Sequence, residues 1–218
     1  MSTGLNGVPP DVAALWSELD YEVTWLHGRW QIYRQLFGTD EERVEILNRS
    51  AGTFAQVLQN VLLDDVQLGL AKLGDPAQTG RFKNLTVTAL VKAISTNEPG
   101  LEPMMTLNLS KYQDKCDKIR ARRNKHIAHF DHETMVNRHA VPLTGPSREE
   151  IEMALFALRE LMNAIQLHFN NSQTAYEIII LESDGDHLIA MLKRGIRYQQ
   201  LVRSGAISVT DLAEHWSL

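Results

Sequence analysis

The chain has 218 residues and a formal net charge of −5, and 44% of its residues are hydrophobic. These values are ordinary for a soluble globular protein and argue against a generally basic nucleic-acid coat protein. Cys116 is the only cysteine, which excludes an intrachain disulfide and a multi-cysteine zinc motif. No signal peptide is visible and the apolar runs are too short to span a bilayer, so we expect a cytoplasmic protein without a membrane partner.

Apolar residues recur at steps of three and four along the first half of the chain, which predicts helices. The first helix should cover about 9–37. The second should run to Leu73, with Thr39 as its cap and Glu42 completing a capping box. A shorter helix is expected over about 85–95, capped by Asn84, and a fourth is expected to begin near Leu107. Glycine and proline residues separate these helices.

The second half of the chain begins with a predicted loop over 131–146, which shows no helical period. Ser147 should start a fifth helix, with Glu150 completing a capping box. The stretch 176–181 (YEIIIL) reads either as a short strand or as a buried turn, and a helix over about 186–203 follows.

These patterns predict an all-α fold. We expect an up-and-down bundle of four to five helices over 1–172. A small C-terminal helical extension over 173–218 should pack on that bundle.

Basic residues are concentrated in one segment. Between Lys111 and Lys125 there are seven Lys and Arg residues and two Asp residues, a formal charge of +5 against about −10 for the rest of the chain. This asymmetry is typical of a local anion-binding patch. Its candidates for RNA contacts are Lys115, Lys118, Arg122, Lys125 and His126. The alternative is a solvated helix face paired with acids on neighbouring helices.

Arg123 occupies an unusual place in this segment. The apolar stripe Leu109, Tyr112, Cys116 and Ile119 continues to Arg123, where a core residue is expected. A guanidinium is costly to bury alone, so it requires a carboxylate partner, a wet cleft or an interface with an anionic ligand. Asp65, on the stripe of the second helix, is the candidate partner. The alternative is a buried Arg123–Asp65 pair with no ligand.

His129 follows Arg123 by six residues, which is about 120° around an ideal helix and roughly 9 Å along it. The two side chains therefore cannot be simple helical neighbours, whereas Arg122 shares a face with His129. Either the helix bends or ends near Ala128, or the two residues meet their copies across a two-fold axis.

The residue types in this stretch suit metal-free cleavage of RNA. A histidine such as His129 can remove the proton of a ribose 2′-hydroxyl or protonate the leaving oxygen. Arg123 can hold phosphoryl oxygens, and Asn124 is a candidate orienting donor. Zinc is a competing interpretation, because His126, His129 and His132 are three apart with Asp131 and His139 nearby. Too few further ligands can be named, so we expect no metal and no cofactor.

The stretch RNKHIAH resembles the arginine-to-histidine signature of the HEPN superfamily, with Arg123, Asn124 and His129 at its fixed positions. Three blocks in order are similar to the abortive-infection protein U branch of that superfamily: LLDDVQLGLAKLGDP, KNLTVTALVKAI and RARRNKHIAHFD. The resemblance covers roughly residues 10–170.

The resemblance implies an all-α bundle and a homodimer with the two motifs in a shared cleft. It also implies a metal-independent endoribonuclease in which Arg123 and His129 are catalytic, with a 2′,3′-cyclic phosphate as product. Such proteins are often toxins of toxin–antitoxin or phage-defence systems, with an antitoxin protein as a partner. Two alternatives remain: a non-catalytic HEPN module that binds RNA, a nucleotide or a partner protein, and a purely structural helical dimer.

Overall fold

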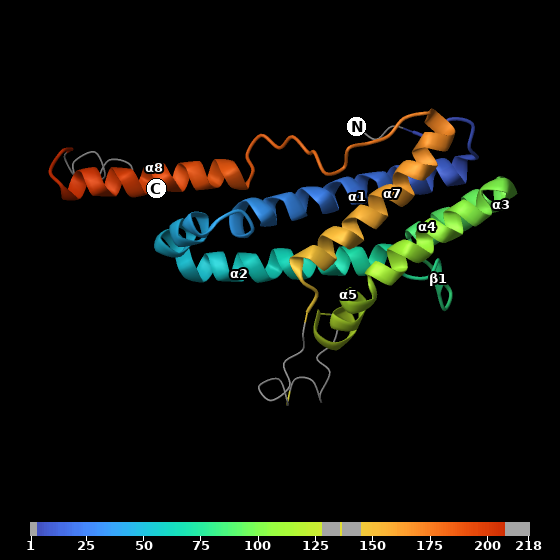
Figure 1. Cartoon of the computed structure of the whole chain (residues 1–218), viewed down its shortest axis with the longest axis horizontal. Coiled ribbons are helices and arrows are strands. Elements are labelled where there is room, and N and C mark those ends of the chain that lie inside the picture. Colours follow the sequence, from blue (N-terminus) through green and yellow to red (C-terminus); the bar gives the residue numbers. More distant parts are fainter. Residues whose placement is uncertain (1–3, 128–135, 137–144, 208–218) are drawn as a thin grey trace. The chain divides into compact units, whose positions relative to one another are not determined.

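The computed structural model describes residues 4–127, 136 and 145–207, and these residues form an all-α protein (Figure 1). The predicted fold class is confirmed. The chain separates into two compact units, one formed by Met1–Trp30 and Leu62–Ile179 and the other by Gln31–Val61 and Ile180–Leu218. The division into a bundle over 1–172 and an extension over 173–218 stays a prediction.

Two long helices begin the fold, and their extents agree with the predicted ones. Helix α1 is Pro10–Phe37, and helix α2 is Glu41–Leu73 with a kink at Ala51. The predicted cap of α2 is wrong: the Asp40 carboxylate accepts from the Arg43 backbone N–H at 2.9 Å. The Thr39 hydroxyl donates instead to the carbonyl of Arg34, at 3.0 Å. Thr39 thus satisfies the end of α1, and Asp40 begins α2.

A short β-hairpin follows α2. Strand β1 (Gln78–Thr79) pairs antiparallel with strand β2 (Phe82–Lys83), and Gly80 has a φ of 57° in the turn. The Asn84 side chain, predicted to cap a helix, instead donates to the Pro76 carbonyl and the Thr79 hydroxyl, at 2.9 and 2.8 Å. Thr86 caps helix α3 (Val87–Asn97), because its hydroxyl accepts from the Ala89 backbone N–H at 3.1 Å.

The predicted fourth helix is three consecutive pieces. After the 3₁₀ turn η1 (Pro99–Leu101) come helix α4 (Glu102–Lys115), helix α5 (Asp117–Arg122) and the π-helical turn η2 (Arg123–Ile127). Helix α4 begins before Leu107, the predicted start, because Pro103 lies in its first turn, where a missing N–H costs nothing. Cys116 separates α4 from α5.

Helix α7 (Arg148–Asn170) confirms the predicted start at Ser147. The Ser147 hydroxyl accepts from the Glu150 backbone N–H, and the Glu150 carboxylate accepts from the Ser147 N–H, which is the predicted capping box. The helix ends at Asn171, which has a φ of 50°.

The core of the first unit lies between α1, α3, α4 and α7. Helix α4 packs against both α7 and α3. The large side chains buried there come from every helix of the unit: Trp16, Leu19, Leu26, Leu70, Leu90, Ile94, Met105, Tyr112, Ile119, Ile151, Leu158 and Tyr176. Tyr176 belongs to YEIIIL, which forms a turn and no strand, and its hydroxyl donates to Asp20 at 2.5 Å.

The second unit contains helix α8 (Gly185–Arg203), close to the predicted range. Asp184 caps it, because its carboxylate accepts from the His187 backbone N–H at 3.2 Å. Gln35 donates to the same carboxylate at 2.6 Å, and Arg43 forms an ion pair with Asp186. In both units, none of the helices in the described ranges has the length and apolarity needed to cross a membrane.

Candidate functional site

The predicted site residues lie along the helical run that ends in the π turn. Lys115 is the last residue of α4, Lys118 and Arg122 lie in α5, and the turn η2 contains Arg123, Asn124, Lys125 and His126. The predicted catalytic residue His129 lies outside the described residues, and so do His132 and His139.

Arg123 is held by two side chains. Its Nη1 donates to both carboxylate oxygens of Asp75, at 2.8 and 2.7 Å, and its Nε donates to the side-chain oxygen of Asn124 at 3.0 Å. The Arg123 side chain is 18% exposed and that of Asp75 is 28% exposed. Charge-assisted hydrogen bonds of this kind are short and directional. The guanidinium of Arg123 therefore has a defined orientation in a half-buried position.

The expected pairing of Arg123 with Asp65 is wrong. Asp65 forms an ion pair with Arg29 of α1, with 2.7 Å between Oδ2 and Nε. Its neighbour Asp64 accepts instead from Nη2 of Arg122, also at 2.7 Å. Successive helical residues point about 100° apart, so the two aspartates face different helices. Asp75, beyond the end of α2, is the residue that reaches Arg123.

Side chains from α4 and α5 fix the end of α2. The Tyr112 hydroxyl donates to the Leu70 carbonyl, and Nη2 of Arg120 donates to the Gly74 carbonyl, each at 2.5 Å. The last carbonyls of a helix lack partners within it, so these contacts complete the helix end. A Cβ at Gly74 would lie 2.6 Å from Nη2 of Arg120, so any larger residue there would displace that guanidinium. The next residue, Asp75, is thereby fixed in place beside Arg123.

The π turn changes the geometry expected for the motif. The α-helix ends at Arg122, earlier than the bend or end predicted near Ala128, and η2 contains no buried residue. A π turn has i→i+5 hydrogen bonds, and such turns are frequent at functional sites. The angle of about 120° expected between Arg123 and His129 holds for an ideal α-helix, whereas Arg123–Ile127 form a π turn.

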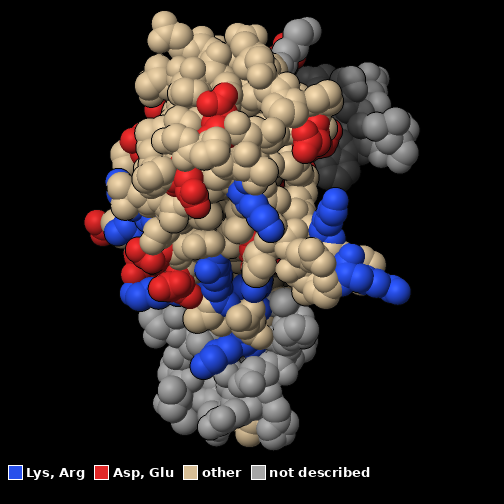
Figure 2. Space-filling model, turned by 90° about the vertical axis from the view of Figure 1, so that its right-hand side faces the viewer, with Lys and Arg blue, Asp and Glu red and all other residues tan. Residues whose placement is uncertain are grey.

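The five residues predicted to bind RNA differ in their surroundings. Arg122 is engaged by Asp64, and Lys118 forms a hydrogen-bonded ion pair with Glu150 of α7. The hydrogen bond from Lys118 lowers the pKa of the Glu150 carboxyl. Lys115 and Lys125 are exposed, and His126 is half-buried. Figure 2 shows Lys and Arg side chains mainly across the lower half of the face in view, and Asp and Glu side chains mainly above them and on the left.

A metal site is the alternative chemistry for the histidines near the motif. In residues 4–127, 136 and 145–207, no group of three His, Cys, Asp or Glu residues is arranged to hold a metal ion. Of the residues considered for zinc, His126 is the only one within these ranges. Arg123 and Asp75 already form an ion pair, so the carboxylate beside the motif serves the guanidinium.

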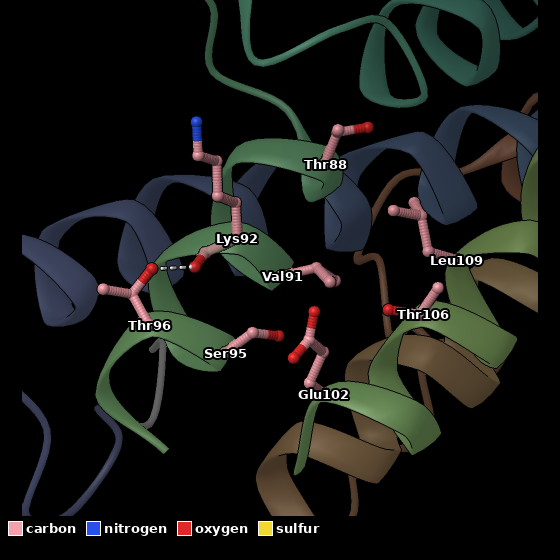
Figure 3. Close-up of a pocket in the computed structure, with 8 residues that line it drawn as sticks. All are labelled: Thr88, Val91, Lys92, Ser95, Thr96, Glu102, Thr106 and Leu109. Atoms are coloured by element: carbon pink, nitrogen blue, oxygen red, sulfur yellow. Dashed lines mark hydrogen bonds between the residues drawn. The ribbon is translucent and has the colours of Figure 1, made fainter. Parts of the chain in front are cut away.

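A pocket of about 410 Å³ lies elsewhere, between α3 and α4. In Figure 3 the Ser95 hydroxyl and the Glu102 carboxylate point into it, and the Lys92 ammonium points away. Its remaining lining residues are Thr88, Val91, Thr96, Thr106 and Leu109. None of the predicted site residues lines it, so the polar cluster around Arg123 is the stronger candidate site.

Asp75 is the site residue that sequence reasoning missed. It lies at the end of the block LLDDVQLGLAKLGDP, which carries part of the family resemblance but predicts no partner for Asp75. A charged residue directly after a helix-ending glycine was a weak signal, because its partner is 48 residues away in the chain.

Comparison with known proteins identifies the family of the chain. The model of the HEPN family described as AbiU2 matches residues 10–188, which is most of the chain and includes Asp75 and Arg123. No curated protein and no solved structure gives a significant match. The predicted resemblance to the abortive-infection branch of the HEPN proteins is confirmed: the chain belongs to the AbiU2 family of the HEPN superfamily.

Proposed function

We propose that this protein is a metal-independent endoribonuclease of HEPN type that acts as a toxin in a toxin–antitoxin or phage-defence system. One observation carries the proposal. Arg123 is anchored through Nη1 and Nε, and within the described residues no hydrogen bond occupies its Nη2. Nη2 therefore offers two N–H donors, in a fixed orientation, to a phosphoryl oxygen of RNA.

The proposed reaction is a transesterification within the RNA chain. The ribose 2′-oxygen attacks the adjacent phosphorus, and the bond from phosphorus to the 5′-oxygen breaks. The products are a 2′,3′-cyclic phosphate and a free 5′-hydroxyl. Arg123 stabilises the charge that develops on the phosphoryl oxygens, and His129 transfers a proton as general base or general acid. Asn124 orients Arg123 through the hydrogen bond to Nε.

The proposed enzyme is a homodimer that brings two copies of the motif together, as the family resemblance implies. An antitoxin protein would bind this toxin and restrain it. The test of catalysis requires no added partner, because any solution of the purified protein already contains the second copy that the proposed homodimer requires.

The test compares RNA cleavage by the full-length protein and by two variants, Arg123→Ala and His129→Ala. Unstructured RNA is incubated with each protein in the presence of EDTA. Wild type should produce 2′,3′-cyclic phosphate ends, and both variants should lose activity. Arg49→Ala is the matched control, because Arg49 is an exposed arginine of α2, 55% exposed, in the other unit. Cleavage that persists in both site variants would contradict the proposal.

The ion pair between Arg123 and Asp75 also favours a second function, that of a non-catalytic HEPN module that binds RNA. Asp75 offsets the charge of Arg123, which weakens its attraction for a phosphoryl group. Binding of RNA by wild type without any cleavage would support this module and reject the endoribonuclease. A pH profile of cleavage that shows no histidine titration between about pH 5 and 8 would reject the role of His129.

A further inference from the structure

The β-hairpin after α2 exposes an aromatic ring between two cations. Phe82 is 65% exposed, and the Cζ atom of Arg81 lies 5.1 Å from the centroid of its ring. Lys83 follows Phe82 and is also exposed. In this part of the fold, then, an apolar ring and two cations face solvent together. Figure 1 shows the hairpin projecting from the helices around it.

Packing does not account for this hairpin. Each strand has two residues and all four are exposed. A pair of strands this short is marginal by itself. Hydrogen bonds hold it instead: the Asn84 side chain binds the Pro76 carbonyl and the Thr79 hydroxyl, and the Gln78 side chain binds the Gly80 carbonyl at 2.7 Å. Polar contacts at the base and the turn thus keep Phe82 in a defined place in solvent.

The chain segment that contains the hairpin is basic in sequence, although two of its cations, Lys118 and Arg122, pair with Glu150 and Asp64 outside the segment. Residues 72–125 contain eleven Lys and Arg residues and five Asp and Glu residues, in a chain whose net charge is −5. A basic surface with an exposed aromatic ring is the chemistry that binds single-stranded nucleic acid. The cations bind phosphates, and the ring stacks on a base whatever its identity. A duplex offers no free base face to such a ring.

The hairpin is also near the Arg123 site. Four residues separate Asp75 from Thr79, so their Cα atoms are at most about 14 Å apart. Phe82 pairs with Thr79 in the ladder, which adds about 5 Å. Phe82 therefore lies within about 20 Å of the residue that holds Arg123, a distance covered by about six stacked nucleotides.

We propose that Phe82 is a stacking platform for a base of single-stranded RNA that flanks the scissile bond, with Arg81 and Lys83 binding the adjacent phosphates. This rests on the proposed function for the identity of the ligand, and it adds a substrate class: single-stranded RNA, held outside the catalytic motif.

The chain contains a matched control for this ring. Phe156 of α7 is 54% exposed, and the Cζ atom of Arg159 lies 5.4 Å from its centroid. Arg159, however, pairs with Glu177 at 3.4 Å, and α7 has further glutamates at Glu149, Glu150, Glu152 and Glu160. The same ring and cation thus occur in acidic surroundings, where a polyanion is repelled.

The experiment measures binding of a fluorescein-labelled, single-stranded 2′-O-methyl RNA, which lacks the attacking hydroxyl. Fluorescence anisotropy gives the Kd for the full-length protein and for Phe82→Ala, Phe82→Trp and Phe156→Ala. Phe82→Ala should weaken binding by about 5- to 150-fold, the range that corresponds to the loss of one stacked base. Phe82→Trp should retain binding, and Phe156→Ala should leave the Kd unchanged. Replacing the oligonucleotide by its duplex should remove the dependence on Phe82.

An unchanged Kd for Phe82→Ala overturns the inference, and so does wild type that does not bind the oligonucleotide. If Phe82 instead contacts a protein partner, the Kd for RNA should be unchanged in Phe82→Ala. If wild type cleaves RNA and Phe82→Ala leaves the Kd unchanged, the proposed function stands without this subsite. If the Kd depends on Phe82 and no RNA is cleaved, the subsite stands and the endoribonuclease is rejected. Because Phe82 is exposed, an unchanged melting temperature should accompany each result.

Discussion

Helix α7 and the helical run from α4 to η2 pack against each other, yet they are built differently. Helix α7 has 23 residues without interruption, a capping box at its start and a left-handed residue at its end. The other run divides into α4, α5 and a π turn within residues 102–127. Its buried apolar residues end at Ile119, and beyond it come arginines held by aspartates.

The difference shows which interactions specify an uninterrupted helix and which specify an interrupted one. An apolar stripe with local caps is sufficient for a regular helix such as α7. The irregular end of the motif run depends on polar contacts with another part of the chain, where Arg120 and Arg123 bind Gly74 and Asp75. Stability should therefore depend mainly on α7 and its neighbours, and activity mainly on the motif run.

The largest expected effect is on activity, from Arg123→Lys. Lysine keeps the charge but loses the planar fork, so it cannot bind Asp75, Asn124 and a phosphoryl oxygen together. We expect kcat for RNA cleavage to fall by roughly 10²- to 10³-fold, with a nearly unchanged melting temperature. Arg29→Lys, at the ion pair with Asp65, is the control and should retain kcat. If kcat falls equally in both variants, the Arg123–Asp75 pair is no more important for activity than the Arg29–Asp65 pair.

Leu158→Ala should have the opposite profile. Leu158 is fully buried in α7, so truncation leaves a cavity and should cost about 2–5 kcal/mol of unfolding free energy. Urea denaturation measures this loss. RNA cleavage per folded molecule should remain close to wild type. A large fall in that specific activity would show that α7 also shapes the site.

The buried histidine His27 should make the stability of the fold fall in acid. Burial lowers the pKa of His27 from 6.5 to about 4, and its Nδ1 lies 2.8 Å from the Val23 carbonyl. Between these two pH values the unfolded chain binds more protons than the folded one, so stability falls as the pH falls. The loss should reach roughly 3 kcal/mol below pH 4.

His27→Phe removes this titration while keeping a ring next to Tyr176, whose centroid lies 5.7 Å from that of His27. Urea unfolding at pH 7 and pH 4 should show a smaller drop for the variant than for wild type. An equal drop in both proteins would exclude His27 as the cause.

The smallest expected change is that of Tyr112→Phe. It removes the hydrogen bond to the Leu70 carbonyl and keeps the buried ring, so it should cost about 1 kcal/mol of unfolding free energy. It should also lower RNA cleavage, because that contact helps to fix the end of α2 and so Asp75. Tyr33→Phe, at a buried tyrosine of α1 that belongs to the other unit, offers a comparison. Unchanged cleavage in Tyr112→Phe would show that Asp75 is positioned without this contact.

Much of the fold was predictable because its signals are local. Helices α1, α2 and α8 are signalled by apolar residues at helical spacing and by the residues that end them. The capping box at Ser147 likewise depends on residues three positions apart. The break at Cys116 and the π turn have no local sequence signal, and the residues around them bind the distant end of α2. The helical period and the motif predict Arg123 as a site residue. Its partner was misassigned to Asp65, because a stripe position says nothing about which neighbouring helix it faces.

Cys116, at the junction of α4 and α5, can report local opening of that junction. The thiol is fully buried, and burial raises its pKa to about 11, so in the closed state it is protonated and inaccessible to reagents. It is also the only cysteine in the chain. The rate of modification by a thiol reagent at neutral pH therefore reports how often the α4–α5 junction opens. RNA bound at the neighbouring motif should slow that rate if it holds the junction closed.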